Sequence, residues 1–197
     1  MKGYKPGEIV PEKPPVVEMN NLLMQWGSNQ VLNRVNLQMN SGERLAIVGP
    51  SGCGKSTILR LLAGLMLPSK GNLRLFGKDQ NYLRLDQAKP PDVRFVFQNP
   101  ALLGSLTVKE NVGFLLNKDK TLSEETIQNR VIKCLKEVGL YNVANKFPGQ
   151  LSGGMQKRVS FARALINDPL NKDNSIPLLL YDEPTAGLDP IACTRIE

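Results

Sequence analysis

The chain has 197 residues, of which 41% are hydrophobic, and a formal net charge of +7. This length suits one compact domain with a helical lobe, and no run approaches the ~20 apolar residues that span a bilayer. A membrane role would therefore require a separate partner. The basic residues are spread along the chain without interleaved aromatics, so the charge does not indicate a nucleic-acid surface. Three cysteines, at positions 53, 134 and 193, lack metal-ligand spacing and fit a reducing compartment.

The N-terminal part begins with a stretch that predicts a flexible leader over residues 1–15. It holds four prolines and several charges, and it has no apolar segment typical of a signal peptide. From Val16 to Phe76 the pattern predicts an antiparallel sheet, because runs such as Val31–Met39 alternate apolar and polar residues. Turn residues at Ser41-Gly42 and Gly77-Lys78-Asp79 separate its strands.

A glycine-rich loop fits the pattern G-x-x-x-x-G-K-[ST] and consists of Gly49, Pro50, Ser51, Gly52, Cys53, Gly54, Lys55, Ser56 and Thr57. We expect a strand over residues 44–48 before it and a helix from Thr57 to Leu67 after it, which is the context of a phosphate-binding loop rather than of an ordinary turn. The glycines let backbone N–H groups point at phosphates. Lys55 would reach the β- and γ-phosphates, and Ser56 would offer its hydroxyl to Mg²⁺. Cys53 occupies a free position of the motif and is interpreted as filler rather than a redox switch.

Helices are predicted over residues of about 99 to 160. Thr107-Val108-Lys109-Glu110 is a capping box that opens a short helix. Ser123 is the expected cap of a longer helix that Gly139 ends. Apolar residues recur in it at helical spacing, namely Ile127, Val131, Leu135 and Val138.

The segment Leu151-Ser152-Gly153-Gly154-Met155-Gln156 predicts an anion site. Ser152 is a good N-cap, and the two glycines leave bare N–H groups at the start of a helix that runs to Ile166. An ordinary capped helix is the alternative, but two glycines in the first turn lower helix stability. A γ-phosphate is the ligand that we expect there.

A buried strand is predicted over Leu178–Tyr181, with Asp182 and Glu183 at its carboxyl end. Open α/β sheets place ligands at that edge. Asp182 would hold the Mg²⁺ shell, and Glu183 would polarise the attacking water. Paired acids at a strand end are often only solvated, but Lys55 and Ser56 upstream favour the catalytic interpretation.

With these motifs the chain resembles the ATP-binding-cassette ATPases over roughly residues 16 to 197. The residues that carry the resemblance are the loop 49–57, Gln98 in Phe95-Val96-Phe97-Gln98, the signature 151–156, the acidic strand end 178–183, and Ala186-Gly187-Leu188-Asp189. The resemblance implies an α/β fold: a phosphate-loop NTPase core with a parallel sheet, an N-terminal antiparallel β subdomain and an inserted helical subdomain. We expect antiparallel β and core over 16–98, the helical subdomain over 99–160, and a return to the core over 161–197.

The family also implies function. The chain would be the ATP-binding and ATP-hydrolysing subunit of a transporter, with Lys55, Gln98 and Glu183 as catalytic residues. Gln98 would sense nucleotide, Mg²⁺ and a transmembrane permease, and would join Ser56 and Asp182 as a metal ligand. Two copies would form a head-to-tail homodimer in which Ser152, Gly153 and Gly154 close the other copy's ATP site.

Trp26, the only tryptophan, stands where the family usually has a tyrosine that stacks on adenine. Its ring can supply that surface, and packing beneath the small N-terminal sheet is the alternative. The polar stretch from Asn167 to Pro177 is longer than a compact connection needs. Together with the sequences of residues 105–112 and 153–159, this stretch resembles the ATPases of Mce-type lipid transport systems, closest to the plastid and cyanobacterial branch. That branch implies a lipid-binding Mce-type partner and a peripheral place on the cytoplasmic face of the membrane, or on the stromal side in a plastid.

The chain departs from the family because it contains no histidine, whereas these ATPases contact the γ-phosphate with one. We expect a C-terminally truncated chain, with a nucleotide-binding regulatory or hydrolysis-deficient fragment as the alternative. A relative acting in translation or DNA repair would show two cassettes or a coiled coil. A generic phosphate-loop kinase would not need the signature.

Overall fold

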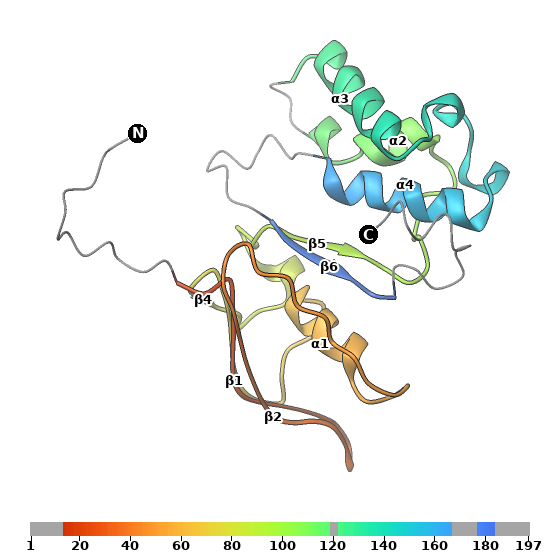
Figure 1. Ribbon diagram of the computed structural model, residues 1–197. Coiled ribbons are helices and arrows are strands. Elements are labelled where there is room, and N and C mark those ends of the chain that lie inside the picture. Colours follow the sequence, from red (N-terminus) through yellow and green to blue (C-terminus); the bar gives the residue numbers. More distant parts are fainter. Residues whose placement is uncertain (1–13, 119–121, 167–176, 184–197) are drawn as a thin grey trace, which may run out of the picture. The chain divides into compact units, whose positions relative to one another are not determined.

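The computed structural model describes residues 14–118, 122–166 and 177–183 (Figure 1). The chain divides into two compact units, Met1–Pro91 and Asp92–Glu197, and each is described by itself. The expected leader, the stretch 167–176 and Ala186–Asp189 lie wholly or almost wholly outside the described residues.

The first unit contains a four-stranded antiparallel sheet in the order β2-β1-β3-β4. Its elements are β1 (Val17–Trp26), β2 (Asn29–Met39), α1 (Lys55–Leu62), β3 (Lys70–Leu75) and β4 (Lys78–Asp79). The sheet predicted from the alternating pattern is thus confirmed, with Trp26 opposite Asn29 across the first hairpin. The second hairpin turns at Phe76-Gly77, both at positive φ, so Lys78 and Asp79 belong to a strand rather than to the turn.

The helix after the loop is shorter than predicted because Gly64 ends it. Gly64 adopts φ +68°, its N–H donates to the Leu61 carbonyl, and the Leu65 N–H donates back to Arg60. These two bonds form a Schellman motif that satisfies the last carbonyls of α1. The helix therefore spans Lys55–Leu62, and its expected continuation to Leu67 is wrong.

The strand expected over residues 44–48 is also not formed. This segment has no regular secondary structure, and Leu45 and Val48 are 52% and 88% exposed. A strand needs a neighbouring backbone to pair its N–H and C=O groups. Within the described part of the chain, residues 44–48 do not belong to either hydrogen-bonded sheet.

The second unit pairs a two-stranded parallel sheet with helices. Its elements are β5 (Val93–Val96), α2 (Val108–Gly113), α3 (Glu124–Glu137), α4 (Gly153–Leu165) and β6 (Leu178–Tyr181). β5 and β6 run parallel in the register Val93↔Leu178 to Val96↔Tyr181, which confirms the buried strand before the acidic pair. Parallel neighbours far apart in sequence require a crossover connection, and the helices of this unit lie within it.

The caps predicted for the helices are confirmed. Thr107 and Glu110 form the capping box of α2, and the Ser123 hydroxyl accepts from the Thr126 N–H at the start of α3. Gly139, at φ +68°, follows the end of α3. The helices enclose one apolar core to which Val112, Val131, Leu135, Val159 and Ala162 contribute. The architecture is therefore the predicted α/β fold, with an antiparallel β part, a parallel sheet and a helical part.

Candidate functional site

The side chain of Lys55 folds back onto the glycine-rich loop. Lys55 begins α1, and its Nζ donates to the carbonyl oxygens of Gly49 and Pro50 at 2.9 Å each. Gly54 precedes the helix at φ +99°, and a Cβ there would meet Leu32 Cδ2 at 2.8 Å and the Val31 carbonyl oxygen at 3.3 Å. Only glycine fits this position without strain. The loop thus carries a cation and the N-terminus of a helix in one segment, which suits a phosphate group.

Ser56 and Thr57 follow Lys55 in the first turn of α1, and Thr57 is buried. Cys53 is exposed, and its Sγ lies 2.8 Å from where a Cβ on Gly49 would stand. The residues predicted for phosphate binding therefore share one loop and one helix turn. A hydroxyl and a lysine at a helix N-terminus are a donor set that fits a nucleotide with Mg²⁺.

The acidic strand end meets the glutamine predicted as a sensor. Gln98 follows β5 and Glu183 follows β6, and Gln98 Nε2 donates to Glu183 Oε2 at 2.7 Å although the two residues are 85 positions apart. The parallel register extends to this edge, since the Asp182 N–H donates to the Val96 carbonyl at 3.0 Å. Two of the three residues predicted as catalytic are therefore brought together at the carboxyl edge of the parallel sheet.

The backbone of Glu183 supports a functional role for this edge. Glu183 adopts φ +47° and is exposed. Residues other than glycine rarely occupy the left-handed region, and such positions cluster at functional sites. Glu183 thus combines an exposed side chain with a backbone conformation that has an energetic cost.

The signature forms an open helix N-terminus. The Ser152 hydroxyl accepts from the Met155 N–H at 3.3 Å and caps the 13-residue helix α4. A Cβ added at Gly153 would meet no atom within 4 Å, and Ser152 and Gly153 are exposed. Farther along α4, Val159 and Ala162 are fully buried. One end of a firmly packed helix thus presents N–H groups to an approaching anion.

Trp26 ends β1 with 48% of its surface exposed. Its indole is therefore available for contact with a ligand. Its role in adenine binding stays a prediction.

Asn111, which was not predicted from the sequence, holds the chain after Gln98 in place. Asn111 is fully buried in α2, its Oδ1 accepts from the Leu103 N–H, and its Nδ2 donates to the carbonyls of Leu103, Leu106 and Thr107. An asparagine just after a capping box could have been noticed, because an amide in a helix that packs into a core needs such partners.

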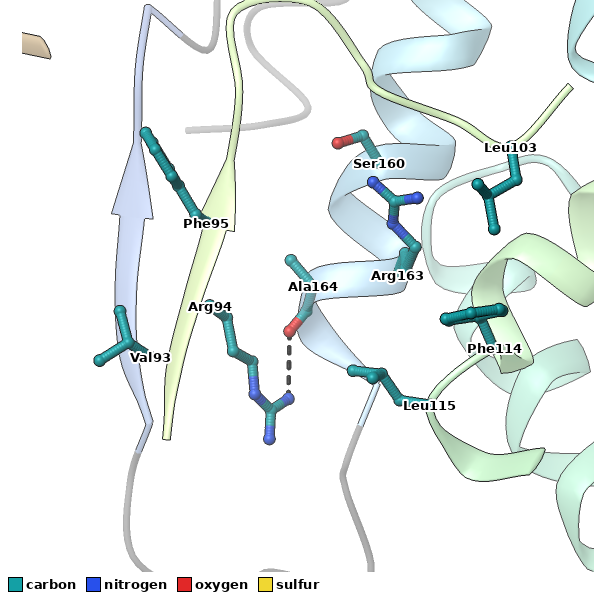
Figure 2. A pocket seen from close by; sticks show the side chains of 9 residues that line it. All are labelled: Val93, Arg94, Phe95, Leu103, Phe114, Leu115, Ser160, Arg163 and Ala164. Carbon is teal, nitrogen blue, oxygen red and sulfur yellow. Dashed lines mark hydrogen bonds between the residues drawn. The ribbon is translucent and has the colours of Figure 1, made fainter. Parts of the chain in front are cut away.

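An apolar pocket lies between β5, α4 and the residues around Leu103 and Phe114 (Figure 2). It has a volume of about 350 Å³ and is lined by Val93, Arg94, Phe95, Leu103, Phe114, Leu115, Ser160, Arg163 and Ala164. Its apolar rim is open to solvent, since Leu103, Phe114 and Leu115 are 40%, 39% and 36% exposed. All of its residues belong to the second unit.

Three features together define an ATP-binding cassette. They are the phosphate-binding loop, the glutamine–glutamate pair at the end of the parallel strands, and the open N-terminus of the signature helix. The chain belongs to the ABC transporter family, whose profile matches residues 32–186. The Lys55 and Ser56 loop lies in the first unit and the acidic pair in the second, so the assignment of Ser56, Gln98 and Asp182 to one metal ion stays a prediction.

Similar proteins come from plants and bacteria. The chain is 44% identical over 183 residues to Protein TRIGALACTOSYLDIACYLGLYCEROL 3, chloroplastic, of Arabidopsis thaliana, covering 92% of this chain and 53% of that protein. It is 41% identical to the spermidine/putrescine import ATP-binding protein PotA of Haemophilus influenzae, covering 92% of this chain and 46% of PotA. The chain thus spans about half the length of the curated relatives it matches.

Solved structures agree with the fold. The dimeric post-hydrolysis state of the ATP-binding cassette MJ0796, bound to ADP and Pi, matches with a TM-score of 0.77 and 35% identity, covering 91% of this chain and 79% of that one. A second dimeric structure of MJ0796 matches with a TM-score of 0.78. In the described segments, every helix is too short or too polar to cross a membrane.

Proposed function

We propose that the chain is the ATP-hydrolysing subunit of a membrane transporter whose cargo is a lipid. The observation that carries the proposal is the 2.7 Å contact between Gln98 and Glu183 at the carboxyl edge of the parallel sheet. That edge is where α/β proteins act on ligands. The same chain carries a phosphate loop and an open signature helix, and its family is that of the ABC transporters.

Nucleotide binding is assigned to residues of the first unit. Lys55 Nζ is held by two carbonyl oxygens of its own loop, and an anion that takes their place gains a full charge interaction. The backbone N–H groups of residues 49–57 would bind the phosphates, and the exposed face of Trp26 would stack on adenine.

Hydrolysis is assigned to Glu183, which would orient the attacking water and accept its proton. Bound Mg²⁺, held by Ser56, Asp182 and Gln98, would neutralise charge on the phosphates. In the present structure the Glu183 carboxylate accepts from the Gln98 amide. This hydrogen bond fixes the position of the carboxylate and leaves its other lone pairs for water. A movement of Gln98 would therefore reposition Glu183, so Gln98 would link nucleotide sensing to the geometry of the proposed base.

Two copies of the chain would complete each site. The open N-terminus of α4 fits a phosphate supplied from outside its own unit, because a Cβ at Gly153 would meet no atom of the described residues within 4 Å. The solved structures of MJ0796 are dimeric, which supports the pairing of two copies. A single copy would bind ATP, and turnover would require the second.

The membrane partner is proposed to contact the apolar pocket of the second unit. Its exposed rim residues Leu103, Phe114 and Leu115 lie on the segments that follow Gln98, so a permease bound there would be adjacent to the sensor. Exposed apolar patches of this kind are typical of interaction sites. The chain would then lie peripherally on the cytoplasmic or stromal face.

A lipid cargo and an Mce-type partner are supported by the Arabidopsis relative, which is named after a galactolipid. The PotA relatives favour a polyamine instead. The two cargoes differ in charge and solubility, and an assay with the permease bound can separate them.

Glu183→Gln tests the proposed activity. We expect the protein to release phosphate from ATP with its permease bound, and the Glu183→Gln variant to bind ATP without turnover, a loss of at least about a hundredfold. Glu137→Gln, at the exposed end of α3, is the matched control and should keep wild-type turnover. Equal activity in all three proteins would contradict the assignment of the base, and ATP binding without turnover in the wild type would favour the regulatory alternative.

The cargo is tested in the same complex. Galactolipid-containing vesicles should stimulate phosphate release, and spermidine in their place should not. Stimulation by spermidine alone would reject the lipid proposal and leave the ATPase proposal intact.

A further inference from the structure

Two arginines join residues 94–101, called here the Gln98 segment, to the C-terminal half of the signature helix α4. Arg94, in β5, reaches the end of α4, where its Nη1 donates to the Ala164 carbonyl at 3.0 Å (Figure 2). The same nitrogen donates to the Ile166 carbonyl at 2.7 Å. Arg163, in α4, reaches back, and its guanidinium donates to the carbonyls of Ala101 at 3.0 Å and Pro100 at 3.3 Å. The segment that contains Gln98 is thus attached to α4 on both sides.

Arg94 is a fixed attachment. Its side chain is 8% exposed and forms a bidentate pair with Asp92, Nε to Oδ1 at 3.1 Å and Nη2 to Oδ2 at 3.2 Å. A cation at the C-terminus of a helix also interacts favourably with the helix dipole. The start of the segment therefore moves together with α4.

Arg163 is an attachment that can be released. In the described part of the chain its guanidinium donates to two backbone carbonyls, and Ala101, which accepts one of these bonds, adopts φ +47°. An alanine in the left-handed region has a conformational cost, because its Cβ crowds the following carbonyl oxygen. Release of Arg163 would let Ala101 return to an ordinary conformation, so the bond and the backbone conformation depend on each other.

The attachment lies between two parts of the proposed site. Gln98, three residues before Ala101, binds Glu183, and α4 begins at Ser152 with the signature. A helix of 13 residues packed in a core transmits a shift at one end to the other as a rigid body. A movement of Gln98 would therefore reach the signature through Arg163.

We propose that Arg163 is a positioning residue that links the conformation of the Gln98 segment to the orientation of the signature helix. This inference rests on the proposed function. ATP in one site would act on Gln98, and Arg163 would align Ser152 and Gly153 for the phosphate bound by the partner copy. The two ATP sites of a dimer would thereby be coupled within each subunit, without a residue that touches both nucleotides.

The test is a double-mutant cycle of Arg163→Gln and Gln98→Ala, measured in the full-length protein on a Glu183→Gln background. The readouts are ATP affinity of the single copy, by equilibrium dialysis, and ATP-driven dimerisation, by sedimentation velocity. Arg163→Gln should weaken dimerisation about tenfold and leave ATP affinity unchanged. In the Gln98→Ala background it should have no further effect, because residues that act in one chain of contacts are not additive.

Three further variants keep the outcome clear. Arg163→Lys should restore part of the dimerisation, since an ammonium can donate to the same carbonyls. Ala101→Gly should keep or strengthen it, because glycine adopts positive φ without strain. Arg130→Gln, the same change on α3, should have no effect. Additive effects of Arg163→Gln and Gln98→Ala, or a loss that follows the melting temperature alone, would overturn the inference. Absence of ATP binding in the parent protein would instead refute the proposed function.

Discussion

Replacement of Gly54 by alanine should destabilise the first unit because two costs coincide at this position. The residue adopts φ +99°, where an L side chain is strained by about 1–2 kcal/mol. Its Cβ would lie 2.8 Å from Leu32 Cδ2 and 3.3 Å from the Val31 carbonyl oxygen. Leu32 is only 4% exposed and cannot move freely, so overpacking adds about 1–3 kcal/mol.

The sum of about 2–5 kcal/mol corresponds to a fall in Tm of about 5–15 °C for a chain of this size. Differential scanning fluorimetry without nucleotide measures it. Gly153→Ala is the control, since a Cβ there meets no atom within 4 Å and alanine is the better helix former. It should leave the Tm unchanged or raised but impair ATP-driven dimerisation. Equal Tm values for the two variants would refute the reasoning about Gly54.

Other predictions concern the second unit and the cysteines. Burial, with a smaller contribution from Glu137, raises the pKa of Cys134 to about 11. In a Cys193→Ser background, maleimide at pH 8 should therefore label the exposed Cys53 first. Cys134 should react only as the pH approaches 11. Asn111→Leu should cost about 2–4 kcal/mol in urea unfolding, because it leaves several buried backbone groups without partners. Hydrogen bonds from Thr107 hold the pKa of Glu110 below 4.5, so the Tm advantage over Glu110→Gln should be complete above pH 4.5 and be lost as the pH falls through the lowered pKa.

Features decided within a few residues could be predicted from the sequence. The capping box at Thr107 and the cap at Ser123 formed as expected, since each depends on neighbours in the chain. The end of α1 also depends on a neighbouring residue, Gly64. The helix was nevertheless predicted to continue to Leu67, because the apolar residues continue that far.

Features that depend on distant partners could not be predicted. Residues 44–48 have strand-like composition, yet a strand forms only where another backbone pairs with it. The motifs identified Gln98 and Glu183 one by one, but the hydrogen bond between them is a property of the parallel sheet. Arg94 and Arg163 donate to backbone carbonyls, which any residue can offer, so no sequence pattern marks these contacts.

The half-exposed Trp26 gives the protein an intrinsic optical reporter. It is the only tryptophan in the chain, and with 48% of its surface exposed its emission responds to whatever covers the ring. When the protein is excited at the red edge of indole absorption, the emission therefore comes from one side chain of the first unit. Stopped-flow measurement of this emission would test without a dye whether adenine binds at Trp26 as proposed, and it would separate that step from the later events proposed at Gln98 and Glu183 in the second unit.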